Sequence, residues 1–365
     1  MLVSLAVVLL VGSFTSSAVL TALAKRVAPR LGLVAHPRAD RYHRAVIPLG
    51  GGIAIFLTLA LFLIAGAAAM QLLIAPGYFG GLAERAGLNP ADFQRHAGEL
   101  LAILLCATIL FLVGLRDDKH ALGPFVKLAF QLLVAILAAT FADVRVEFFI
   151  QSRIVTTVLS AFWIVLIVNA FNFLDNMDGA SAGMAAIASS ILLTAAAFNG
   201  QVFVSGLAIA FIGALLGFLV FNFPPASIFM GDAGSLVVGF FVALLTLRTD
   251  YYRQAQSGSW YPVLLPLIAM AVPLYDFTSV TLLRLSQGKS PFVGDTQHFS
   301  HRLRRRGLTD TQTALTLYLA TLCTGLGATF LYQVNLIGAI LIVGQTLLIV
   351  GIIGVFESTG KAEDR

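Results

Sequence analysis

Long apolar segments separated by short polar ones make up almost the whole of this 365-residue chain. A helix needs about 20 apolar residues to cross the hydrocarbon core of a bilayer, within a range of roughly 17–25. The pattern therefore predicts an all-α integral membrane protein with about 11 transmembrane helices. The expected spans are residues 2–24, 50–74, 98–115, 125–142, 154–171, 181–199, 202–221, 235–249, 262–284, 312–332 and 335–356.

The basic residues between the spans predict how the chain is oriented. Cytoplasmic loops of membrane proteins carry an excess of Lys and Arg. Placing the N-terminus outside puts 17 of the 23 Lys and Arg residues at the inner face, so we expect a cytoplasmic C-terminus. We expect one polytopic domain over 1–356 in the cell inner (plasma) membrane, a cytoplasmic tail at 357–365, and inner loops at 25–49, 116–124, 172–180, 222–234 and 285–311.

The start of the chain does not have the order of a signal peptide. No basic residue precedes the first apolar run, Leu2 to Leu23, and Lys25 and Arg26 follow it. A signal peptide has its positive charges before its apolar region. We therefore expect an uncleaved first span.

The composition agrees with a membrane protein. Hydrophobic residues make up 58% of the chain and charged residues 11%, against about 25% charged residues in soluble domains. The net charge of +5 reflects the basic inner loops, so we expect no nucleic-acid partner. Cys106 and Cys323 both lie within apolar runs, which predicts neither a disulfide framework nor a zinc site.

Five polar clusters fall in the inner loops and carry the candidate chemistry. The first is the acidic pair Asp117 and Asp118, directly after span 98–115. An ordinary polar helix end is one interpretation of this pair. Two adjacent carboxylates are costly near hydrocarbon, which favours a paired or metal-linked role instead.

The second cluster ends span 154–171 and contains Asn172, Asp175 and Asp178. These residues follow one another at intervals of three, which puts them on one face if the helix continues. Carboxylate and amide groups on one face can hold a hard cation and contact the polar edge of a nucleotide. The alternative is a solvated helix end that Gly179 terminates.

The third cluster is the proline- and glycine-rich segment 223–235. Gly231 and Gly234 permit a close backbone approach. Asp232 precedes a predicted helix start, where free N–H groups attract anions, although it can equally be a simple N-cap. Phe229 either stacks on a base or packs in the membrane.

The last two clusters are basic. His298 and His301 are three residues apart and precede Arg302, so one helical face can present both imidazoles to a phosphate. A basic loop that only orients the protein explains the arginines of 285–311 but not the histidine pair. His43 and Arg44 precede the glycines at 50–52, and either phosphate contact or topology accounts for them.

Together the clusters indicate phosphoryl transfer. The chain has no G-x-x-x-x-G-K-[ST] motif and no Ser-His-Asp or CxxC signature. Phosphoryl transfer needs mostly positioning and charge neutralisation by a metal, which carboxylate-rich loops supply. A transporter would spread its acids through the membrane depth, whereas these acids gather at the inner edge. The loops assigned to the outer face hold no dense cluster of carboxylates and histidines.

Segments 114–118, 172–179 and 229–235 resemble, in sequence and order, the motifs of the polyprenyl-phosphate N-acetylhexosamine-1-phosphate transferases, glycosyltransferase family 4. The similarity covers about 36–307 and is greatest to the GlcNAc-1-phosphate branch. It implies transfer of a sugar-1-phosphate, GlcNAc-1-phosphate above all, from a UDP-sugar to polyprenyl (undecaprenyl) phosphate, with release of UMP. It also implies Mg²⁺ as cofactor, with Mn²⁺ as an alternative, and a first membrane step of cell-envelope polysaccharide synthesis, such as that of O-antigen.

The resemblance implies roles for the clustered residues. Asp117, Asp118 and Asp175 match catalytic positions, and Asp232 with Asp175 match the Mg²⁺ ligands. The matching substrate-binding positions are Asn172, Asp178, Phe229, His298, His301, Arg302, His43 and Arg44. The implied partners are the UDP-sugar, polyprenyl phosphate and the membrane, and a homodimer stays open.

The sequence departs from the family pattern at a few positions. The phospho-MurNAc-pentapeptide translocase has three consecutive histidines, which this chain lacks, and His298-Phe299-Ser300-His301 replaces the more usual His-x-His-His. Asn176 stands where Gly is more usual, and Met177 where Leu or Ile is. These differences leave the donor sugar open, with UDP-MurNAc-pentapeptide as the alternative, but not the reaction.

Overall fold

The computed structural model describes residues 2–36, 46–78, 80–85, 89–146, 150–251, 259–290 and 298–358. Its regular structure is almost entirely helical, because apolar segments in lipid must satisfy their backbone hydrogen bonds internally. The helices are α1 (Leu2–Val27), α2 (Gly51–Ala69), α3 (Gly80–Arg85), α4 (Pro90–Lys119), α5 (Pro124–Phe141), α6 (Arg153–Leu174), α7 (Ala180–Phe198), α8 (Val202–Asn222), α9 (Asp232–Arg248), α10 (Leu265–Ala269), α11 (Ala271–Ser286), α12 (Phe299–Arg305), α13 (Asp310–Thr329) and α14 (Leu336–Ser358).

Short elements join or extend these helices. The strands β1 (Val34–Ala35) and β2 (Ile47–Pro48) form an antiparallel pair between α1 and α2. A π-helical turn, Met70–Ile74, continues α2, and 3₁₀ turns at Ala28–Leu31 and Tyr261–Leu264 follow α1 and precede α10.

The helices coincide with the predicted spans. Eight are long and apolar enough to cross a bilayer, and the bent pair Tyr261–Ala269 and Ala271–Ser286 makes nine. The predicted spans 235–249 and 312–332 fall on α9 and α13, and α9 has only 17 residues. By length and composition the described residues thus support eight or nine spans. The prediction of eleven, like that of the orientation, stays a prediction.

The expectation of one continuous helix over 262–284 is wrong. The chain bends by 62° at Met270, between α10 and α11. Pro273 lacks the N–H that would donate to the carbonyl of Ala269, and its ring would clash with that carbonyl in a straight helix. The helix therefore breaks one turn before the proline.

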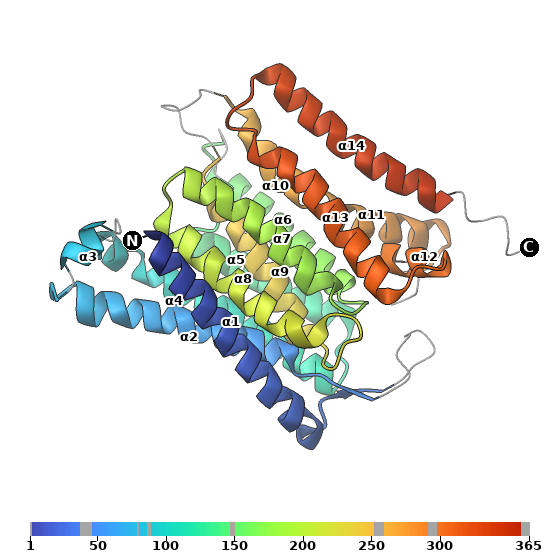
Figure 1. Ribbon diagram of the computed structural model, residues 1–365, viewed down its shortest axis with the longest axis horizontal. Helices are drawn as coiled ribbons and strands as arrows, with labels where there is room; N and C mark the ends of the chain where they lie inside the picture. Colours follow the sequence, from blue (N-terminus) through green and yellow to red (C-terminus); the bar gives the residue numbers. More distant parts are fainter. Residues whose placement is uncertain are drawn as a thin grey trace, which may run out of the picture.

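Helix α9 is the core of the bundle (Figure 1). Fourteen of its 17 residues are buried, as expected for a helix that is apolar on all sides. It packs against α2, α4, α6 and α7. The shortness of α9 fits this position, because its ends are surrounded by other helices and loops rather than by lipid.

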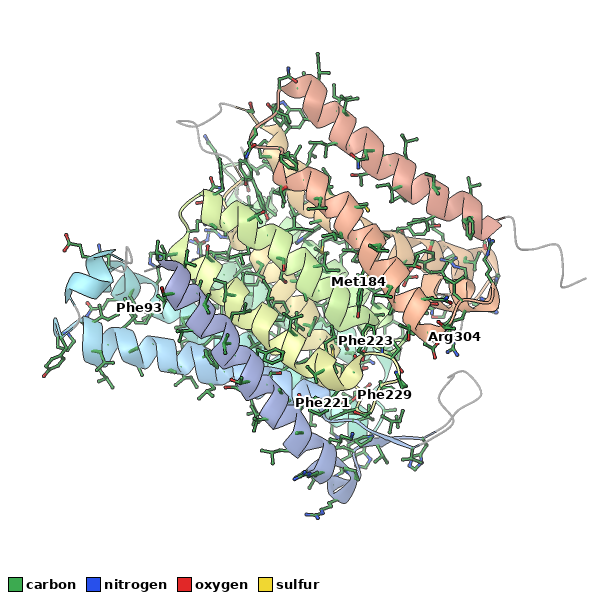
Figure 2. The ribbon with its side chains drawn as sticks, viewed as in Figure 1. Phe93, Met184, Phe221, Phe223, Phe229 and Arg304 are labelled. Atoms are coloured by element: carbon green, nitrogen blue, oxygen red, sulfur yellow. The ribbon has the colours of Figure 1, made fainter. Side chains whose placement is uncertain are left out.

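The outer helices are held differently. Helix α1 packs on α8, where Ser13 and Ser17 face Gly213 and Gly217, and a Cβ at Gly217 would lie 2.3 Å from the carbonyl oxygen of Phe14. Small residues let membrane helices approach this closely. Helix α14 lies along one edge of the bundle beside α13 (Figure 1). Figure 2 shows Phe229 and Arg304 toward one end of the bundle and Phe93 at the other.

Candidate active site

The first residue of α9 is fastened to the last turn of α4. The Asp118 carboxylate accepts hydrogen bonds from the backbone N–H of Asp232 (2.7 Å) and of Ala233 (3.0 Å). These are among the N–H groups that a helix start leaves without intrahelical partners. Gly231, with φ of 70°, is required here, because a Cβ would lie 2.6 Å from an Asp118 oxygen.

Glycines bring three backbones together around this helix start. A Cβ at Gly114 of α4 would lie 2.4 Å from the carbonyl oxygen of Asp232, and one at Gly52 of α2 would lie 2.2 Å from the backbone nitrogen of Gly234. Real side chains cannot occupy those positions without moving backbone. The glycines therefore set how closely α2 and α4 approach α9.

A lysine bridges two of the aspartates. Lys127 Nζ lies 3.1 Å from Asp117 Oδ2 and 2.7 Å from Asp232 Oδ2. The three side chains are 14–25% exposed, so they are accessible from one side. The backbone N–H of Leu122 also donates to Asp117. An ammonium group between two carboxylates offsets their mutual repulsion.

Asn172 extends this group toward the end of α6. Its side-chain amide donates to Asp232 Oδ1 (3.2 Å) and to the Ser235 hydroxyl (2.8 Å). The structure thus brings together Asp117, Asp118, Asn172 and Asp232, which are up to 115 positions apart along the chain. Residues of the first, second and third clusters therefore lie together at the start of α9.

Asn172, Asp175 and Asp178 would share one helical face only if the helix continued through Asp178, and it does not. Helix α6 ends at Leu174, and Asp175 is its half-buried C-cap residue. The chain then turns, Gly179 adopts a φ of 71°, and Asp178 accepts a hydrogen bond from the backbone N–H of Ala226 (2.8 Å). Asp178 therefore ties this turn to the loop that precedes α9.

Phe229 lies where the first loop meets the loop before α9. Its N–H donates to the carbonyl of Pro48 (2.9 Å), and its carbonyl accepts from Gly51 (2.9 Å). The N–H of Gly52 donates to the carbonyl of Met230 (2.9 Å). The glycines at 50–52 thus contact the segment 223–235 directly. His43 and Arg44, which precede these glycines in the sequence, lie outside the described residues.

His298 and His301 lie in a buried network against α11. His298, the N-cap of α12, is 4% exposed, and its Nδ1 lies 3.0 Å from Asp276 Oδ2. Its Nε2 is 3.4 Å from the Arg284 guanidinium, which is itself 5.0 Å from the ring centroid of Phe173. The two histidine rings are 6.1 Å apart.

This network is joined to the aspartates through the end of α6. The Ser300 hydroxyl donates to the Asn176 side chain (2.6 Å), and the Phe173 ring packs edge-on against His298. Arg302 donates to the Ser279 hydroxyl (2.8 Å). Burial lowers the pKa of His301 from its ordinary 6.5 to about 4, so this imidazole is neutral at pH 7.

Three residues of these networks, Lys127, Asp276 and Arg284, are not among the site residues predicted from the sequence. An ionisable residue inside a span is by itself a candidate functional residue, which is the signal that would have found them. Asp276 and Arg284 are eight positions apart, so they share one face of α11 and both reach His298.

Asp117 and Asp232 place two carboxylate groups within reach of one cation, at the position that the Lys127 ammonium takes in this structure. Asp117 and Asp118 lie in the last turn of α4, and Asp175 caps the end of α6. Helix C-termini carry partial negative charge, so carboxylates there need a cation. No three His, Cys, Asp or Glu side chains of the described residues form a ready-made metal cage. Mg²⁺ is usually held by one or two carboxylates together with phosphates, which this donor set allows.

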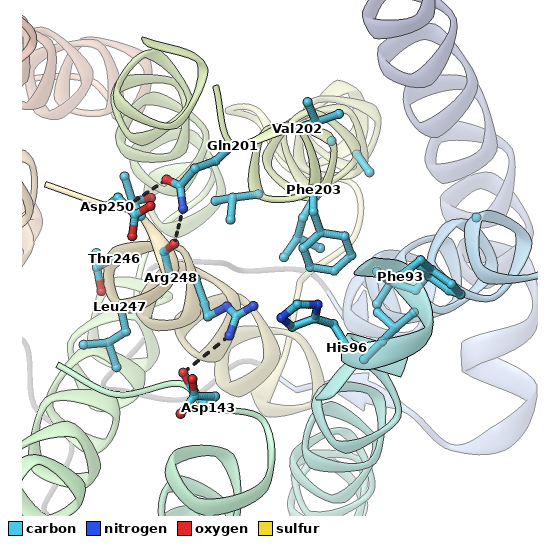
Figure 3. Close-up of a pocket in the computed structure, with 18 of the residues that line it drawn as sticks. Phe93, His96, Asp143, Gln201, Val202, Phe203, Thr246, Leu247, Arg248 and Asp250 are labelled. Carbon is cyan, nitrogen blue, oxygen red and sulfur yellow. Dashed lines mark hydrogen bonds between the residues drawn. The ribbon is translucent and has the colours of Figure 1, made fainter. Parts of the chain in front are cut away.

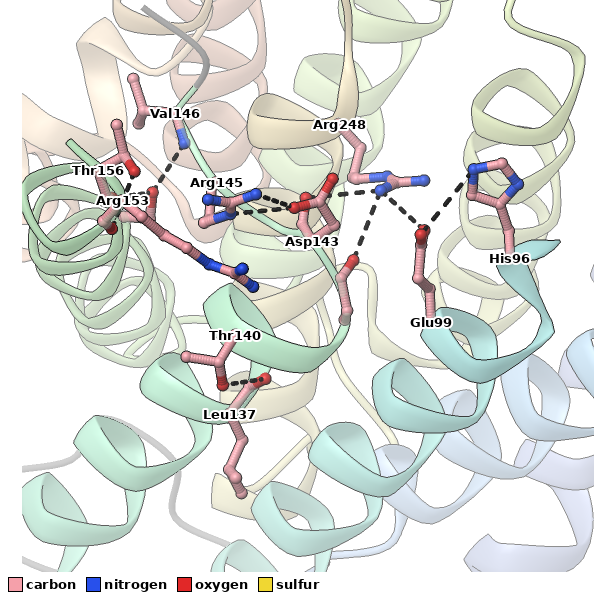
Figure 4. Close-up of polar contacts among 12 residues, drawn as sticks. His96, Glu99, Leu137, Thr140, Asp143, Arg145, Val146, Arg153, Thr156 and Arg248 are labelled. Carbon is pink, nitrogen blue, oxygen red and sulfur yellow. Dashed lines mark hydrogen bonds and ion pairs between the residues drawn. The ribbon is translucent and has the colours of Figure 1, made fainter. Parts of the chain in front are cut away.

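A second polar cluster lies at the other end of the bundle. Glu99, Asp143, Arg145 and Arg248, with His96, gather beside a cavity (Figures 3 and 4). The sequence suggested no dense cluster on that side, because these residues come from three separate segments. Only the packing of α4 and α9 brings them together.

Comparisons with known proteins agree with the site. Residues 100–250, which include the second and third clusters and the Asp117–Asp118 pair, match the sequence profile of glycosyl transferase family 4. A probable undecaprenyl-phosphate N-acetylglucosaminyl 1-phosphate transferase of Bacillus subtilis (strain 168) is 29% identical over 98% of this chain and 93% of its own length.

Two further relatives cover most of the chain. An undecaprenyl-phosphate alpha-N-acetylglucosaminyl 1-phosphate transferase of Salmonella typhi is 28% identical over 89% of this chain and 83% of its own. A decaprenyl-phosphate N-acetylglucosaminephosphotransferase of Mycobacterium tuberculosis is 29% identical over 89% of this chain and 84% of its own. Residues 100–250 thus match glycosyl transferase family 4, and the chain is similar over most of its length to membrane enzymes of the polyprenyl-phosphate sugar-1-phosphate transferase type.

Proposed function

We propose that the protein transfers GlcNAc-1-phosphate from UDP-GlcNAc to undecaprenyl phosphate at the cytoplasmic face of the plasma membrane. The observation that carries the proposal is the Asp117–Lys127–Asp232 bridge, which Asn172 joins from α6. It supplies carboxylates and an ammonium group at one partly exposed place. The relatives, whose names contain undecaprenyl phosphate and an N-acetylglucosaminyl 1-phosphate group, support the choice of substrates.

In the proposed reaction an oxygen of the lipid phosphate attacks the β-phosphorus of the UDP-sugar. A new phosphorus–oxygen bond forms, the bond between the β-phosphorus and the bridging oxygen breaks, and UMP leaves with that electron pair. The second pKa of a phosphate monoester is about 6, so much of the acceptor is already a dianion at neutral pH. Asp117 then orients the acceptor and accepts its remaining proton where one is present.

The other residues around the bridge hold the substrates in place and neutralise their negative charge. Lys127 is placed to contact phosphate oxygens, since its ammonium already bridges two anionic groups. Both oxygens of Asp118 are engaged by the start of α9, so we assign it the task of holding α4 against α9. Asp232 and Asp175 would hold Mg²⁺, or Mn²⁺, which neutralises charge on the diphosphate when bound.

The donor is assigned to the side of the site formed by the end of α6 and α12. Asn172 and Asp178 would contact the nucleotide, with Phe229 as the stacking surface for the uracil. His301 is neutral, so it would donate a hydrogen bond to a phosphate rather than act as a cation. The remaining contacts to the diphosphate would come from Arg302, supported by His298, and from the loop residues His43 and Arg44.

The direct test is UMP release by the purified full-length protein. We expect release from UDP-GlcNAc only when both Mg²⁺ and undecaprenyl phosphate are present. UDP-MurNAc-pentapeptide and other UDP-sugars, assayed in parallel, test the choice of donor. Release without the lipid, or from none of the donors, would contradict the proposal.

A further inference from the structure

A cavity of about 1050 Å³ lies at the end of the bundle opposite the aspartates, and we call it the distal cavity (Figure 3). Its walls come from α1, α2, α4, α6, α8, α9, α10 and the loops beside them. Asp232 begins α9 and Arg248 ends it, so about 24 Å of helix, at 1.5 Å per residue, separates this cavity from the proposed active site. The distal cavity is therefore a second site.

Most of the wall is apolar and continues into the outer surface of the bundle. It includes the rings of Phe62, Phe93, Phe162 and Trp163. Phe162 is 65% exposed and Leu267 is 47% exposed, so this wall reaches the surface that faces lipid. Water forms few hydrogen bonds beside such a wall. The apolar part of the cavity therefore favours occupation by hydrocarbon chains from the bilayer.

One side of the distal cavity is charged. Arg248 pairs with Glu99 at 3.0 Å and lies 3.5 Å from the carbonyl oxygens of Ala142 and Asp143 (Figure 4). Arg145 pairs with the Asp143 carboxylate. The Arg145 and Arg248 side chains are 21% and 19% exposed, so both can touch a ligand.

Hydrogen bonds from Gln201 also hold the charged side of the cavity in place. The Gln201 side chain donates to the carbonyl of Arg248 (2.9 Å) and accepts from the N–H of Asp250 (2.8 Å). The same wall thus presents two guanidinium groups and the carboxylates of Asp143 and Asp250. A site that is apolar on one side and charged on the other fits an amphipathic molecule.

The signs of the charges select the headgroup. Guanidinium groups bind phosphate oxygens through paired hydrogen bonds. The neighbouring carboxylates would repel a headgroup that is only anionic, but they would attract an ammonium group. We propose that the distal cavity binds a phospholipid whose headgroup carries both a phosphate and an ammonium group, with its acyl chains along the apolar wall.

The test is lipid retention by the full-length protein, which needs no enzymatic activity. The protein is reconstituted in vesicles with equal amounts of phosphatidylethanolamine and phosphatidylglycerol, extracted in detergent, washed, and analysed by mass spectrometry. We expect about one phosphatidylethanolamine per chain and a preference of about tenfold over phosphatidylglycerol. Equal retention of the two, or retention of polyprenyl phosphate instead, would overturn the proposal.

Filling the cavity tests the place of binding. A Cβ at Gly66 meets nothing within 4 Å, and Gly66 lines the cavity, so Gly66→Phe adds a ring there. We expect it to lower retention by about tenfold. Gly351→Phe on α14 is the matched control, since a Cβ there also meets nothing and Gly351 does not line the cavity. Equal retention in both variants would overturn the proposal.

Removing one ion pair tests the headgroup contact. The double variant Arg145→Gln/Asp143→Asn leaves neither charge unpaired, which a single substitution would. We expect it to retain lipid but to lose the preference for phosphatidylethanolamine. Arg153→Gln, at an exposed arginine outside the cavity lining, should keep the preference. An unchanged preference in the double variant would contradict the assignment of the phosphate and ammonium groups to this wall.

Discussion

Helices α4 and α9 meet in different ways at their two ends. At the proposed active site their backbones touch, with Gly114 against the carbonyl of Asp232. At the other end the same helices border the distal cavity, and a Cβ at Gly98 of α4 would meet nothing. The contrast indicates that α4 and α9 approach each other most closely at the end that carries Asp117 and Asp232.

The two ends also differ in how the helix dipoles act on their charged side chains. Arg248 lies in the last turn of α9, where the helix dipole favours a cation, and Glu99 pairs with it. Asp117, Asp118 and Asp175 lie at helix C-termini, where the dipole disfavours them. Lys127 and the start of α9 provide positive charge beside Asp117 and Asp118. Carboxylates gathered at helix C-termini favour cations, so this end is the one expected to bind a metal ion together with phosphate.

The strongest test of this difference between the two ends is to make the same chemical change at both. Asp232→Asn removes a proposed metal ligand, and we expect turnover to fall by about 10²–10³-fold, as for other groups that stabilise transition-state charge. Asp143→Asn at the distal end should change turnover by no more than about twofold. UMP release measures both. Comparable losses in the two variants would remove the functional distinction between the ends.

The packing contrast is tested by two alanine substitutions in one helix. Gly114→Ala forces a Cβ against the Asp232 carbonyl, and overpacking of this kind costs about 1–3 kcal/mol. We expect a lower thermal midpoint and turnover reduced by about tenfold, because α4 carries Asp117. Gly98→Ala, in open space, should leave both unchanged. Equal thermal midpoints for the two variants would show that close approach at Gly114 is unnecessary.

A substitution in the buried network around His298 is expected to change activity less. Asp276→Asn weakens the hold on the His298 ring, which would raise KM for the UDP-sugar by about fivefold and leave kcat nearly unchanged. The exposed Thr278→Ala, on the same helix, is the control. An unchanged KM, or a fall in kcat alone, would show that Asp276 does not act through donor binding.

The smallest expected effect is on the dependence of stability on pH. The folded state lowers the pKa of His301 to about 4, so it disfavours the charged form. The stability that neutral His301 contributes is complete above about pH 6.5 and is lost as the pH falls toward 4. We expect His301→Gln to lose fewer degrees of thermal midpoint between pH 7 and pH 4.5 than the unchanged protein. An equal loss would mean that His301 is not buried as a neutral ring.

Much of the architecture was predictable from the sequence, because membrane spans are encoded locally by apolar length. The convergence of Asp117, Asp118 and Asp232 was predictable as well, since each lies at the end of a span that faces the same side. The bend at Met270 had a local signal in Pro273, which was outweighed by the continuous apolar run. Spacing by three did not distinguish a continued helix from a helix end at Asp175–Asp178, and the structure has the helix end, with Gly179 as the N-cap of α7.

The missing parts of the site depend on contacts between distant segments. Lys127 looks like a residue that only marks the end of a span, and its bridge to Asp232 is visible only once α5 and α9 are packed. The pairing of Glu99 with Arg248 has the same origin. Such pairs have no fixed spacing along the chain, so periodicity and motifs do not reveal them.

The most direct measurement is Mn²⁺ binding followed by electron paramagnetic resonance in the presence of UDP-GlcNAc. If the aspartates form the cation site, the unchanged protein and Asp143→Asn will bind Mn²⁺ with the same affinity, and Asp232→Asn will bind it at least about tenfold more weakly. Equal binding by Asp232→Asn, or a loss caused by Asp143→Asn, would contradict the placement of the cation at the α4–α9 contact.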